Sequence, residues 1–370
     1  MSQTETTVIN PLSFALTPST DARAVAERDE ILADPSFGKH FTDHMVTIDW
    51  SIEAGWHDAR VTPYGPLLLD PASSVLHYGQ EIFEGLKAYR HADNSIWTFR
   101  PEKNAERLQR SAHRLALPQL AVDDFIESIR QMIAIDGDWV PSAPETSLYL
   151  RPFMIANESF LGVRAAHKVS FYVIASPAGA YFADGVAPVK IWLSTEYSRA
   201  GRGGTGAAKC GGNYAASLLP QMEAYENGCA QVLFLDGETG SNVDELGGMN
   251  VFFVHGTDTL VTPRLTGSIL EGVTRDSIMQ LARDRGMTVE EREVTLGEWR
   301  EGVASGAITE VFACGTAAVV TPIGQLKARD FTVGEADAPA GEITLSLRQE
   351  LTDIQYGRLP DRHGWLTRLD

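Results

Sequence analysis

Apolar residues recur along the chain with two spacings, one typical of amphipathic helices and the other of strands. A helix is predicted to begin near Arg100–Pro101, because proline is favoured at a helix start and apolar residues follow at 108, 112, 115 and 117. Segments rich in Tyr, Val, Phe and Ile predict strands over 147–155 and 168–175. Similar reasoning predicts helices over 21–33 and 123–135, the second capped by Asp123, and strands over 44–50 and 67–69.

The second half of the chain alternates strands and helices around one glycine-rich loop. Strands are predicted over 189–195, 231–235 and 251–254, and helices over 214–227 and 273–285. The last helix carries Arg283 and Arg285 in its final turn and is followed by Gly286, as helix ends prefer. Both element types occur in both halves, which indicates a mixed α/β fold.

A change in composition predicts a boundary between two domains. The segment SPAGAYFADGVAP at 176–188 holds two prolines, two glycines and four alanines. A chain of 370 residues is long enough for two domains. We therefore expect a smaller N-terminal α/β domain over 1–180, including an N-terminal arm, and a larger C-terminal domain over 181–370, joined by a linker at about 176–188.

Composition and charge exclude several classes of function. Apolar residues make up 44% of the chain and charged residues 22%, a balance that suits a large core. With 31 Lys and Arg against 49 Asp and Glu, the net charge is −18, so we expect no nucleic-acid partner and no anionic membrane partner. No apolar stretch reaches the roughly 20 residues of a membrane span, and the polar N-terminus does not resemble a signal peptide.

The cysteines point to a reducing compartment. The chain has three cysteines, Cys210, Cys229 and Cys314. Their number is odd, and they lack the paired spacing of a disulfide framework or a zinc site. We therefore expect a cytoplasmic protein without a structural metal.

The most distinctive segment is the loop over 201–214, in which six of fourteen residues are glycine and Lys209 stands in the middle. A flexible surface loop with a solvated lysine is one interpretation. A phosphate-binding P-loop is excluded because Cys210 follows the lysine in place of Ser or Thr, and the spacing of a dinucleotide-binding loop fails as well. The other interpretation is a lysine that forms a Schiff base, since glycines allow a bulky planar cofactor to approach closely.

Motifs along nearly the whole chain point to one family. The loop continues into Cys-Gly-Gly-Asn-Tyr at 210–214, followed by Asp-Glu-Leu-Gly-Gly-Met-Asn at 244–250 and Leu-Glu-Gly-Val-Thr-Arg at 270–275. Together with the segments below, these motifs resemble the branched-chain amino acid aminotransferases, which are pyridoxal-phosphate enzymes of fold type IV. The resemblance covers about 37–357 and implies a two-domain fold like that of D-amino acid aminotransferase. Further matching segments lie at 41–45, 77–78, 82–85, 100–107, 150–152, 314–317 and 353–357.

The resemblance implies how pyridoxal 5'-phosphate would be held. Lys209 would bind the cofactor aldehyde and, once freed by the substrate amine, move a proton between the substrate and the cofactor. Glu245, just after a predicted strand, would lie against the ring nitrogen, and Tyr214 would bond the ring hydroxyl. From the residues alone, a solvated turn glutamate and a core tyrosine remain alternatives. The phosphate would be bound by Arg107, by the helix start at Val273 and Thr274, and by Thr316.

The resemblance also implies a substrate pocket. Arg151, two residues after Tyr149 on the same strand face, would receive the side-chain carboxylate of glutamate. The α-carboxylate would meet Thr316 and Ala317. Tyr78 and the segment Leu161–Val163 would reach the site of a second subunit, which implies a homodimer. The aromatic wall would consist of Phe41, Tyr78, Phe83, Tyr149 and Tyr181.

The implied activity is reversible transamination of leucine, isoleucine and valine with 2-oxoglutarate. A D-amino acid aminotransferase or an aminodeoxychorismate lyase of the same fold is the alternative, and a nucleotide-binding module is a more distant one. Gly248 stands where some members carry a threonine, which leaves the preferred substrate open. Ala318 and Thr321 stand where some members carry a redox pair of cysteines, so no such switch is expected, and Cys314 is expected to be an ordinary buried thiol.

Overall fold

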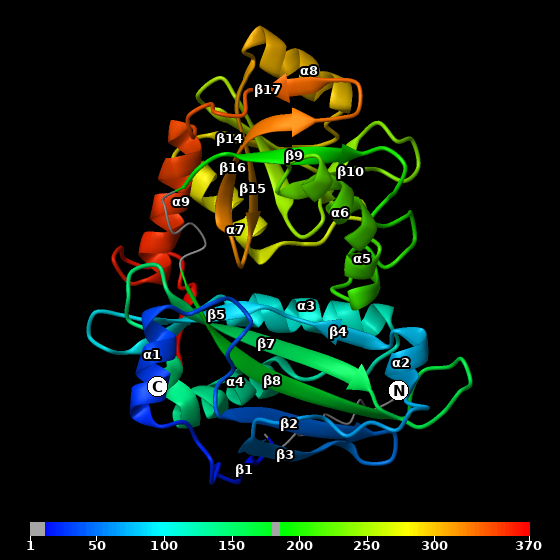
Figure 1. The fold of residues 1–370 in the computed structure, drawn as a ribbon, viewed down its shortest axis with the longest axis vertical. Helices are drawn as coiled ribbons and strands as arrows, with labels where there is room; N and C mark the ends of the chain where they lie inside the picture. The colour runs from blue at the N-terminus through cyan, green and yellow to red at the C-terminus, as the bar shows by residue number, and fades with distance from the viewer. Residues whose placement is uncertain (1–11, 180–185) are drawn as a thin grey trace, which may run out of the picture.

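Two β-sheets organise the molecule. The computed structural model describes residues 12–179 and 186–370, and within these ranges each sheet has nine strands. The sheets form two bodies along the long axis of the molecule, and one long helix, α3 (Pro101–Arg114), lies along the boundary between them (Figure 1). The mixed α/β fold is thereby confirmed.

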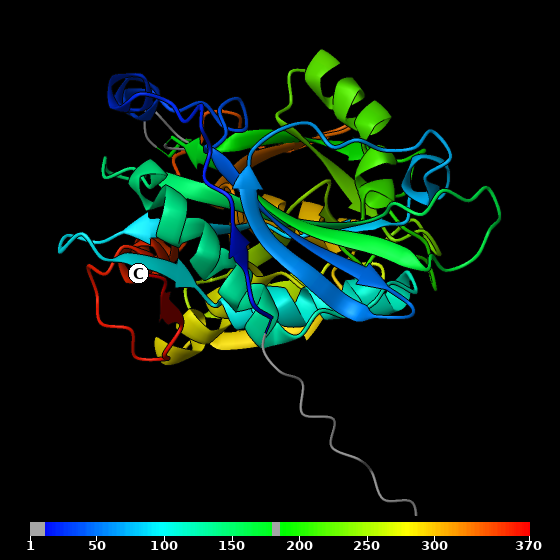
Figure 2. The same ribbon diagram turned by 90° about the horizontal axis from the view of Figure 1, so that it is seen from below.

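The first sheet is built mainly from the first half of the chain. Its spatial order is β1-β3-β2-β8-β7-β5-β6-β18, with β4 also paired to β7. Seen from below, the antiparallel strands β2 and β3 form the outer surface of this body (Figure 2). The strands are β1 (Ala15–Leu16), β2 (His44–Ser51), β3 (Gly55–Pro63), β4 (Glu81–Phe83), β5 (Leu86–Arg90), β6 (Ile96–Phe99), β7 (Ser147–Ala156), β8 (Lys168–Ala178) and β18 (Leu366–Arg368).

The second sheet comes from the second half of the chain. Its order is β11-β10-β9-β16-β15-β12-β13-β14, with β17 also paired to β16. The pairs β10–β9, β16–β9 and β13–β14 are parallel. The strands are β9 (Val189–Ser194), β10 (Gln231–Leu235), β11 (Val243–Leu246), β12 (Asn250–His255), β13 (Thr259–Pro263), β14 (Thr288–Arg292), β15 (Ile308–Gly315), β16 (Val319–Lys327) and β17 (Thr332–Gly334).

The helices pack on the sheets, and α3 shows how the local sequence determines where a helix begins and which side of it is buried. Pro101 opens α3 at the position where no backbone donor is needed, and Ala105, Leu108 and Ala112 form its buried stripe. None of the helices in the described ranges is long and apolar enough to cross a membrane. The other helices are α1 (Val25–Ala33), α2 (Ser74–Tyr78), α4 (Val122–Asp136), a 3₁₀ turn (Gly137–Trp139), α5 (Gly211–Ala215), α6 (Leu218–Glu226), α7 (Val273–Asp284), α8 (Leu296–Ser305) and α9 (Glu342–Gln355).

Apolar cores lie within each body and also between them. One core joins the first sheet to α3 and α4, and another packs α8 on the second sheet. A third core combines Tyr89 and Phe99 of the first sheet with Phe252, Ile278 and Leu347 of the C-terminal half. Strand β18 likewise returns to pair with β6. The domain boundary at 176–188 stays a prediction. Residues 366–368 belong to the first sheet, although they come from the second half of the chain.

Three sequence expectations differ from the structure. Leu67–Leu69 forms no strand, because these residues run beside Pro66 with Leu68 fully exposed and no ladder partner. Asp123 lies inside α4, and Ala121 precedes the helix as its cap. The helix expected over 214–227 is divided into α5 and α6, because Pro220 has no N–H to bond back to the preceding turn and is tolerated only in the first turn of a new helix.

Trp299 provides a test of the core that supports the second sheet. The side chain is buried and packs edge-on against Phe253, with ring centroids 4.9 Å apart. Trp299→Ala is expected to reduce the free energy of unfolding by about 3–5 kcal/mol, as measured by urea denaturation, because a large cavity replaces the ring. Glu301→Ala on the exposed side of α8 is the control. A loss similar to that of the control would show that this ring does not contribute to the core.

Candidate active site

A cavity of about 230 Å³ lies between the two bodies. Its wall takes residues from β7, α3 and the loop between β4 and β5 on one side, and from β11, β12 and the start of α7 on the other. The residues of the glycine-rich loop and of the turn after β15 complete it. The lining residues discussed below are Phe37, Phe83, Arg107, Tyr149, Arg151, Lys209, Tyr214, Glu245, Gly248, Val273, Thr274, Cys314, Thr316 and Ala317.

Lys209 is fixed at the centre of this cavity. Its backbone N–H donates to Ser111 Oγ of α3 at 2.9 Å, and its carbonyl accepts from Phe83 N at 2.9 Å. Its Nζ donates to the Tyr214 hydroxyl at 2.6 Å and lies 4.7 Å from the centre of the Phe83 ring. Burial lowers the pKa of Lys209 to about 8, and the nearby charge of Arg107 acts in the same direction. Lys209 therefore supplies an amine that is partly neutral near physiological pH.

Glu245 lies between the two predicted strands β10 and β12, as expected, but within an additional strand, β11, that was not predicted. Its Oε1 accepts from Leu270 N at 2.9 Å and pairs with Arg199 Nη1 at 2.7 Å, while Oε2 accepts from Asn250 Nδ2 at 3.2 Å. Burial raises the pKa of Glu245 to about 7, and the charge of Arg199 opposes this rise. Sequence reasoning missed Arg199, because nothing near it in the chain indicates that it meets Glu245.

Arg107 meets the start of α7 across the boundary. Its guanidinium pairs with Glu84 through two bonds of 2.8 Å, and Nη1 donates to the Glu271 carbonyl at 3.0 Å. Val273 and Thr274, in the first turn of α7, line the cavity next to it. A helix start offers backbone N–H groups without intrahelical partners, so this corner of the cavity suits an anion. Thr316 also lines the cavity, as expected.

The opposite part of the cavity is aromatic. Arg151 Nη2 donates to the Tyr149 hydroxyl at 3.4 Å, and its guanidinium lies 4.9 Å from the centre of the Phe83 ring. Phe37 packs edge-on against Tyr149 with ring centroids 5.0 Å apart. Gly85 leaves room for the tyrosine, because a Cβ atom there would clash with its hydroxyl. Arg151, Tyr149, Phe83 and Ala317 all line the cavity as expected.

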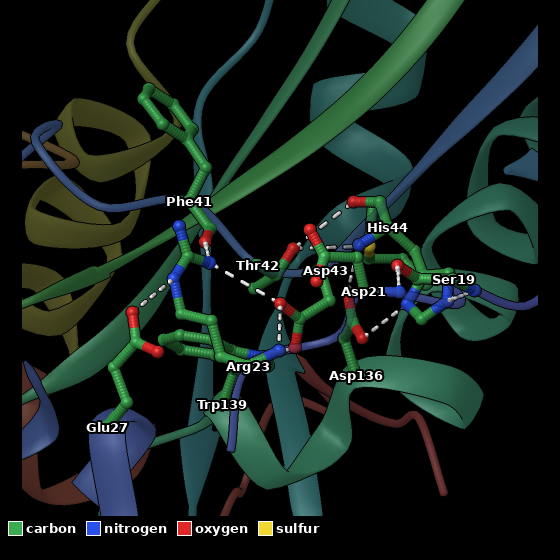
Figure 3. A network of polar contacts seen from close by, with 11 residues as sticks. Ser19, Asp21, Arg23, Glu27, Phe41, Thr42, Asp43, His44, Asp136 and Trp139 are labelled. Atoms are coloured by element: carbon green, nitrogen blue, oxygen red, sulfur yellow. Dashed lines mark hydrogen bonds and ion pairs between the residues drawn. The ribbon is translucent and has the colours of Figure 1, made fainter. Parts of the chain in front are cut away.

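The remaining aromatic residues of the expected wall are Phe41, Tyr78 and Tyr181. Phe41 stacks on Tyr64 with ring centroids 5.0 Å apart and is not among the residues that line this cavity. Its carbonyl accepts from Arg23 Nη1 at 2.8 Å, within the polar network that fixes this segment, while its ring points away (Figure 3). The Tyr78 hydroxyl donates to the Leu161 carbonyl, outside the cavity wall. Tyr181 lies outside the described residues.

Gly248 and Cys314 behave as small wall residues. A Cβ atom on Gly248 would lie 3.9 Å from the Tyr214 ring, so this part of the wall has space for a side chain. Cys314 is buried at the cavity wall, and burial raises the pKa of its thiol to about 12, which keeps it protonated and unreactive. The expectation of a buried thiol at this position is confirmed.

The chain matches known aminotransferases over most of its length. The family model described as Amino-transferase class IV matches residues 81–326. A branched-chain-amino-acid aminotransferase of Mycolicibacterium smegmatis is 58% identical over 97% of this chain and 99% of its own length. This chain belongs to the branched-chain aminotransferases of class IV. The family resemblance of the sequence and the fold type IV that it implied are confirmed.

Solved structures of this family share the fold. The Escherichia coli branched-chain amino acid aminotransferase superposes with a TM-score of 0.71 at 28% identity, covering 84% of this chain and 97% of its own. The branched-chain amino acid aminotransferase of Thermobaculum terrenum superposes with a TM-score of 0.71 at 26% identity, covering 87% of this chain and 98% of its own. The Thermobaculum terrenum protein was solved in its PLP-form, the holo-form.

The lowered pKa of Lys209 gives a prediction about its pH dependence. Only the neutral amine is nucleophilic, so acetylation of Lys209 in protein freed of bound small molecules should reach half its maximal rate near pH 8. Between about pH 8 and 10.5 the unfolded chain binds the Lys209 proton more tightly, so this group makes the fold more stable as the pH rises. Mass spectrometry of the acetylated peptide, with exposed Lys190 as reference site, checks the profile. A midpoint near that of an ordinary lysine, about 10.4, would contradict it.

Proposed function

We propose that this protein transfers the amino group of leucine, isoleucine or valine reversibly to 2-oxoglutarate, using pyridoxal 5'-phosphate held at Lys209. The observation that carries the proposal is the 2.6 Å contact of Lys209 Nζ with Tyr214, in a cavity that also contains Arg107, Glu245 and Arg151. The names of the similar proteins favour this activity over that of a D-amino acid aminotransferase or an aminodeoxychorismate lyase.

The donor set of the cavity fits the proposed cofactor. A phosphate would be held by Arg107, Thr316 and the α7 start at Val273 and Thr274. A basic ring nitrogen would meet the Glu245 carboxylate, and a ring hydroxyl would meet Tyr214. Gly272 keeps the α7 start closely packed, since a Cβ atom there would clash with Asn250 Oδ1. When bound, pyridoxal phosphate supplies an electron-withdrawing ring that stabilises negative charge on the substrate α-carbon.

Lys209 and Tyr214 would handle the protons of the reaction. With its pKa lowered to about 8, Lys209 Nζ can take up a proton from the substrate α-carbon and release it again. Burial raises the pKa of Tyr214 to about 12, so its hydroxyl stays neutral and can accept the bond that Lys209 donates. The Tyr214 hydroxyl therefore orients the amine without competing for its proton.

Glu245 and Arg199 would set the charge next to the ring. Arg199 lies 2.7 Å from the carboxylate and favours its ionised form against the effect of burial. An ionised carboxylate favours a protonated ring nitrogen, which is the more strongly electron-withdrawing form. Arg199 thus acts through Glu245.

One pocket would serve two chemically different side chains. The rings of Phe37, Phe83 and Tyr149 offer apolar surface to a branched aliphatic side chain, at about 25 cal/mol per Å² buried. Burying the second carboxylate of glutamate requires a charged partner, which Arg151 would supply. The aromatic rings around Arg151 hold the guanidinium while leaving it exposed to the cavity.

We also propose that the active form is a cytoplasmic homodimer. The support is the segment Leu161–Val163, in which Leu161 and Val163 are 63% and 83% exposed although both are apolar. The Tyr78 hydroxyl donates to the Leu161 carbonyl, so Tyr78 would also lie close to the second subunit. The cytoplasmic location stays a prediction from the cysteine pattern.

Reduction with borohydride tests the covalent site. Borohydride should fix the cofactor to Lys209, because it reduces the linkage between an amine and an aldehyde, and peptide mapping should locate the label there. Lys209→Ala is expected to lower turnover by at least about 10²–10⁴-fold, the usual contribution of a general acid–base group. Lys190→Ala is the control. Recovery of the label on Lys190 or Lys327 would overturn the assignment.

Arg151→Gln separates the two substrates. Loss of the guanidinium should impair the half-reaction with glutamate more than that with leucine by about 1–3 kcal/mol, or about 5- to 150-fold. The measurement is single-turnover kinetics with each amino acid, followed by cofactor absorbance. Arg329→Gln, an exposed arginine paired with Glu196, is the control with the same change of charge. Equal losses with both amino acids would mean that Arg151 supports the pocket without discriminating.

A further inference from the structure

Glu84 is a buried carboxylate between Phe83 and Gly85, two residues that line the cavity, and the proposed chemistry does not use it. Its side chain is 0% exposed. The segment around it is fixed on both sides, because Phe83 N donates to the Lys209 carbonyl at 2.9 Å and Glu84 N donates to the Pro152 carbonyl at 2.7 Å. The carboxylate therefore has little freedom to move.

The polar contacts of this carboxylate come from the N-terminal half of the chain. Oε1 accepts from Arg107 Nε at 2.8 Å, and Oε2 accepts from Arg107 Nη2 at 2.8 Å. Oε2 also accepts from Asn104 Nδ2 at 2.8 Å and from Gly85 N at 3.3 Å. Burial alone would raise the pKa of Glu84, but the charge and bonds of Arg107, the charge of Lys209 and the bond from Asn104 together outweigh it, so the pKa lies below its usual value. The carboxylate is thus ionised and well supplied with donors.

This pairing fixes which edge of Arg107 faces the cavity. A guanidinium has five N–H donors in one plane. Two of them bind Glu84 and one binds the Glu271 carbonyl, so among the described residues two remain for a ligand. Because a bidentate pair fixes the plane of both groups, the two remaining donors point in a set direction beside the start of α7.

We propose that Glu84 is a positioning residue that aims Arg107 at the phosphate of the cofactor. The inference rests on the proposed function, since it requires that the cavity bind a phosphate-bearing group. Two effects of Glu84 oppose each other. Its charge repels a phosphate dianion, whereas its bonds hold the guanidinium in the orientation that binds one. In this proposal the orientation effect is the larger, because both carboxylate oxygens are bonded to Arg107 at 2.8 Å and fix the plane of its guanidinium.

Comparison of two aldehydes isolates the contribution of the phosphate. Cofactor-free full-length protein is titrated with pyridoxal 5'-phosphate and with pyridoxal, which differ only in the phosphate, and binding is followed by absorbance. Glu84→Gln should reduce the preference for the phosphorylated aldehyde by about 10–100-fold, by analogy with the loss when a residue that orients a metal ligand is replaced. Pyridoxal affinity should stay the same, which a merely structural role would not predict.

Matched variants keep the experiment decisive. Glu298→Gln breaks a bidentate pair with Arg292 that is partly exposed and does not line the cavity, and it should preserve the preference. Glu84→Asp keeps the charge but shortens the reach, so it should also lose the preference, and it decides the matter if Glu84→Gln does not fold. In an Arg107→Lys background, Glu84→Gln should change the preference by less than about twofold, because both act on one interaction.

The outcomes separate this inference from the proposed function. A wild-type preference that Glu84→Gln and Glu84→Asp retain would overturn the positioning role and leave the cofactor assignment intact. Equal weakening of both aldehydes would also overturn it, since the phosphate would not be involved. A wild-type protein without preference for the phosphorylated aldehyde would overturn both.

Discussion

The cavity depends on the pairing of buried charges. Lys209 lies between two buried ion pairs, Arg107 with Glu84 and Arg199 with Glu245. Charges removed from water are costly unless they are paired and hydrogen-bonded. Because both arginines have carboxylate partners, the cost of burying these charges beside the cavity is offset. The amine of Lys209, in contrast, is partly neutral.

Helix α3 connects these charges to both bodies of the molecule. Besides Arg107, three more arginines of this helix and its cap contact residues on the other side of the boundary. Arg100 pairs with Asp276 at 2.7 Å and Arg110 with Glu271 at 2.9 Å, both near the start of α7. Arg114 donates to two carbonyls of the glycine-rich loop. The helix thereby fixes the phosphate corner and the lysine loop relative to the first sheet.

Patterns that are local in the chain were predictable, and contacts between distant residues were not. Helix α3 followed from Pro101 and its apolar stripe. Strand β11 was missed, because the acidic residues Asp244 and Glu245 disfavour a strand until Arg199 compensates their burial. Edge strand β14, with the sequence TVEER, carries charges at most positions and shows no buried alternation. In such segments tertiary contacts decide the structure, and the sequence nearby does not report them.

In the site, too, residues within local motifs were predictable, whereas contacts between distant residues were not. Lys209, Tyr214, Arg151 and Arg107 were recognised through motifs of the family, and they do line one cavity. Glu84 lies in the matching segment 82–85, but its pairing with Arg107 was not predicted, and Arg199 had no local signal, since both pairings form across the fold. Phe37 occupies the aromatic wall near Tyr149, whereas Phe41, four residues later, faces Tyr64. Which of two nearby aromatic residues enters a cavity depends on the path of a loop, which residue type alone does not determine.

The return of β18 to the first sheet has a consequence for biosynthesis. Strand β6 lies between β5 and β18, and β18 is formed by Leu366–Arg368. A ribosome releases the N-terminal strands first, so β6 has an open edge until residues 366–368 have been translated. Unpaired strand edges favour association with other chains. The nascent protein thus carries an exposed pairing edge from the synthesis of residues 96–99 until that of residues 366–368, and the sheet that is begun first is the last to be completed.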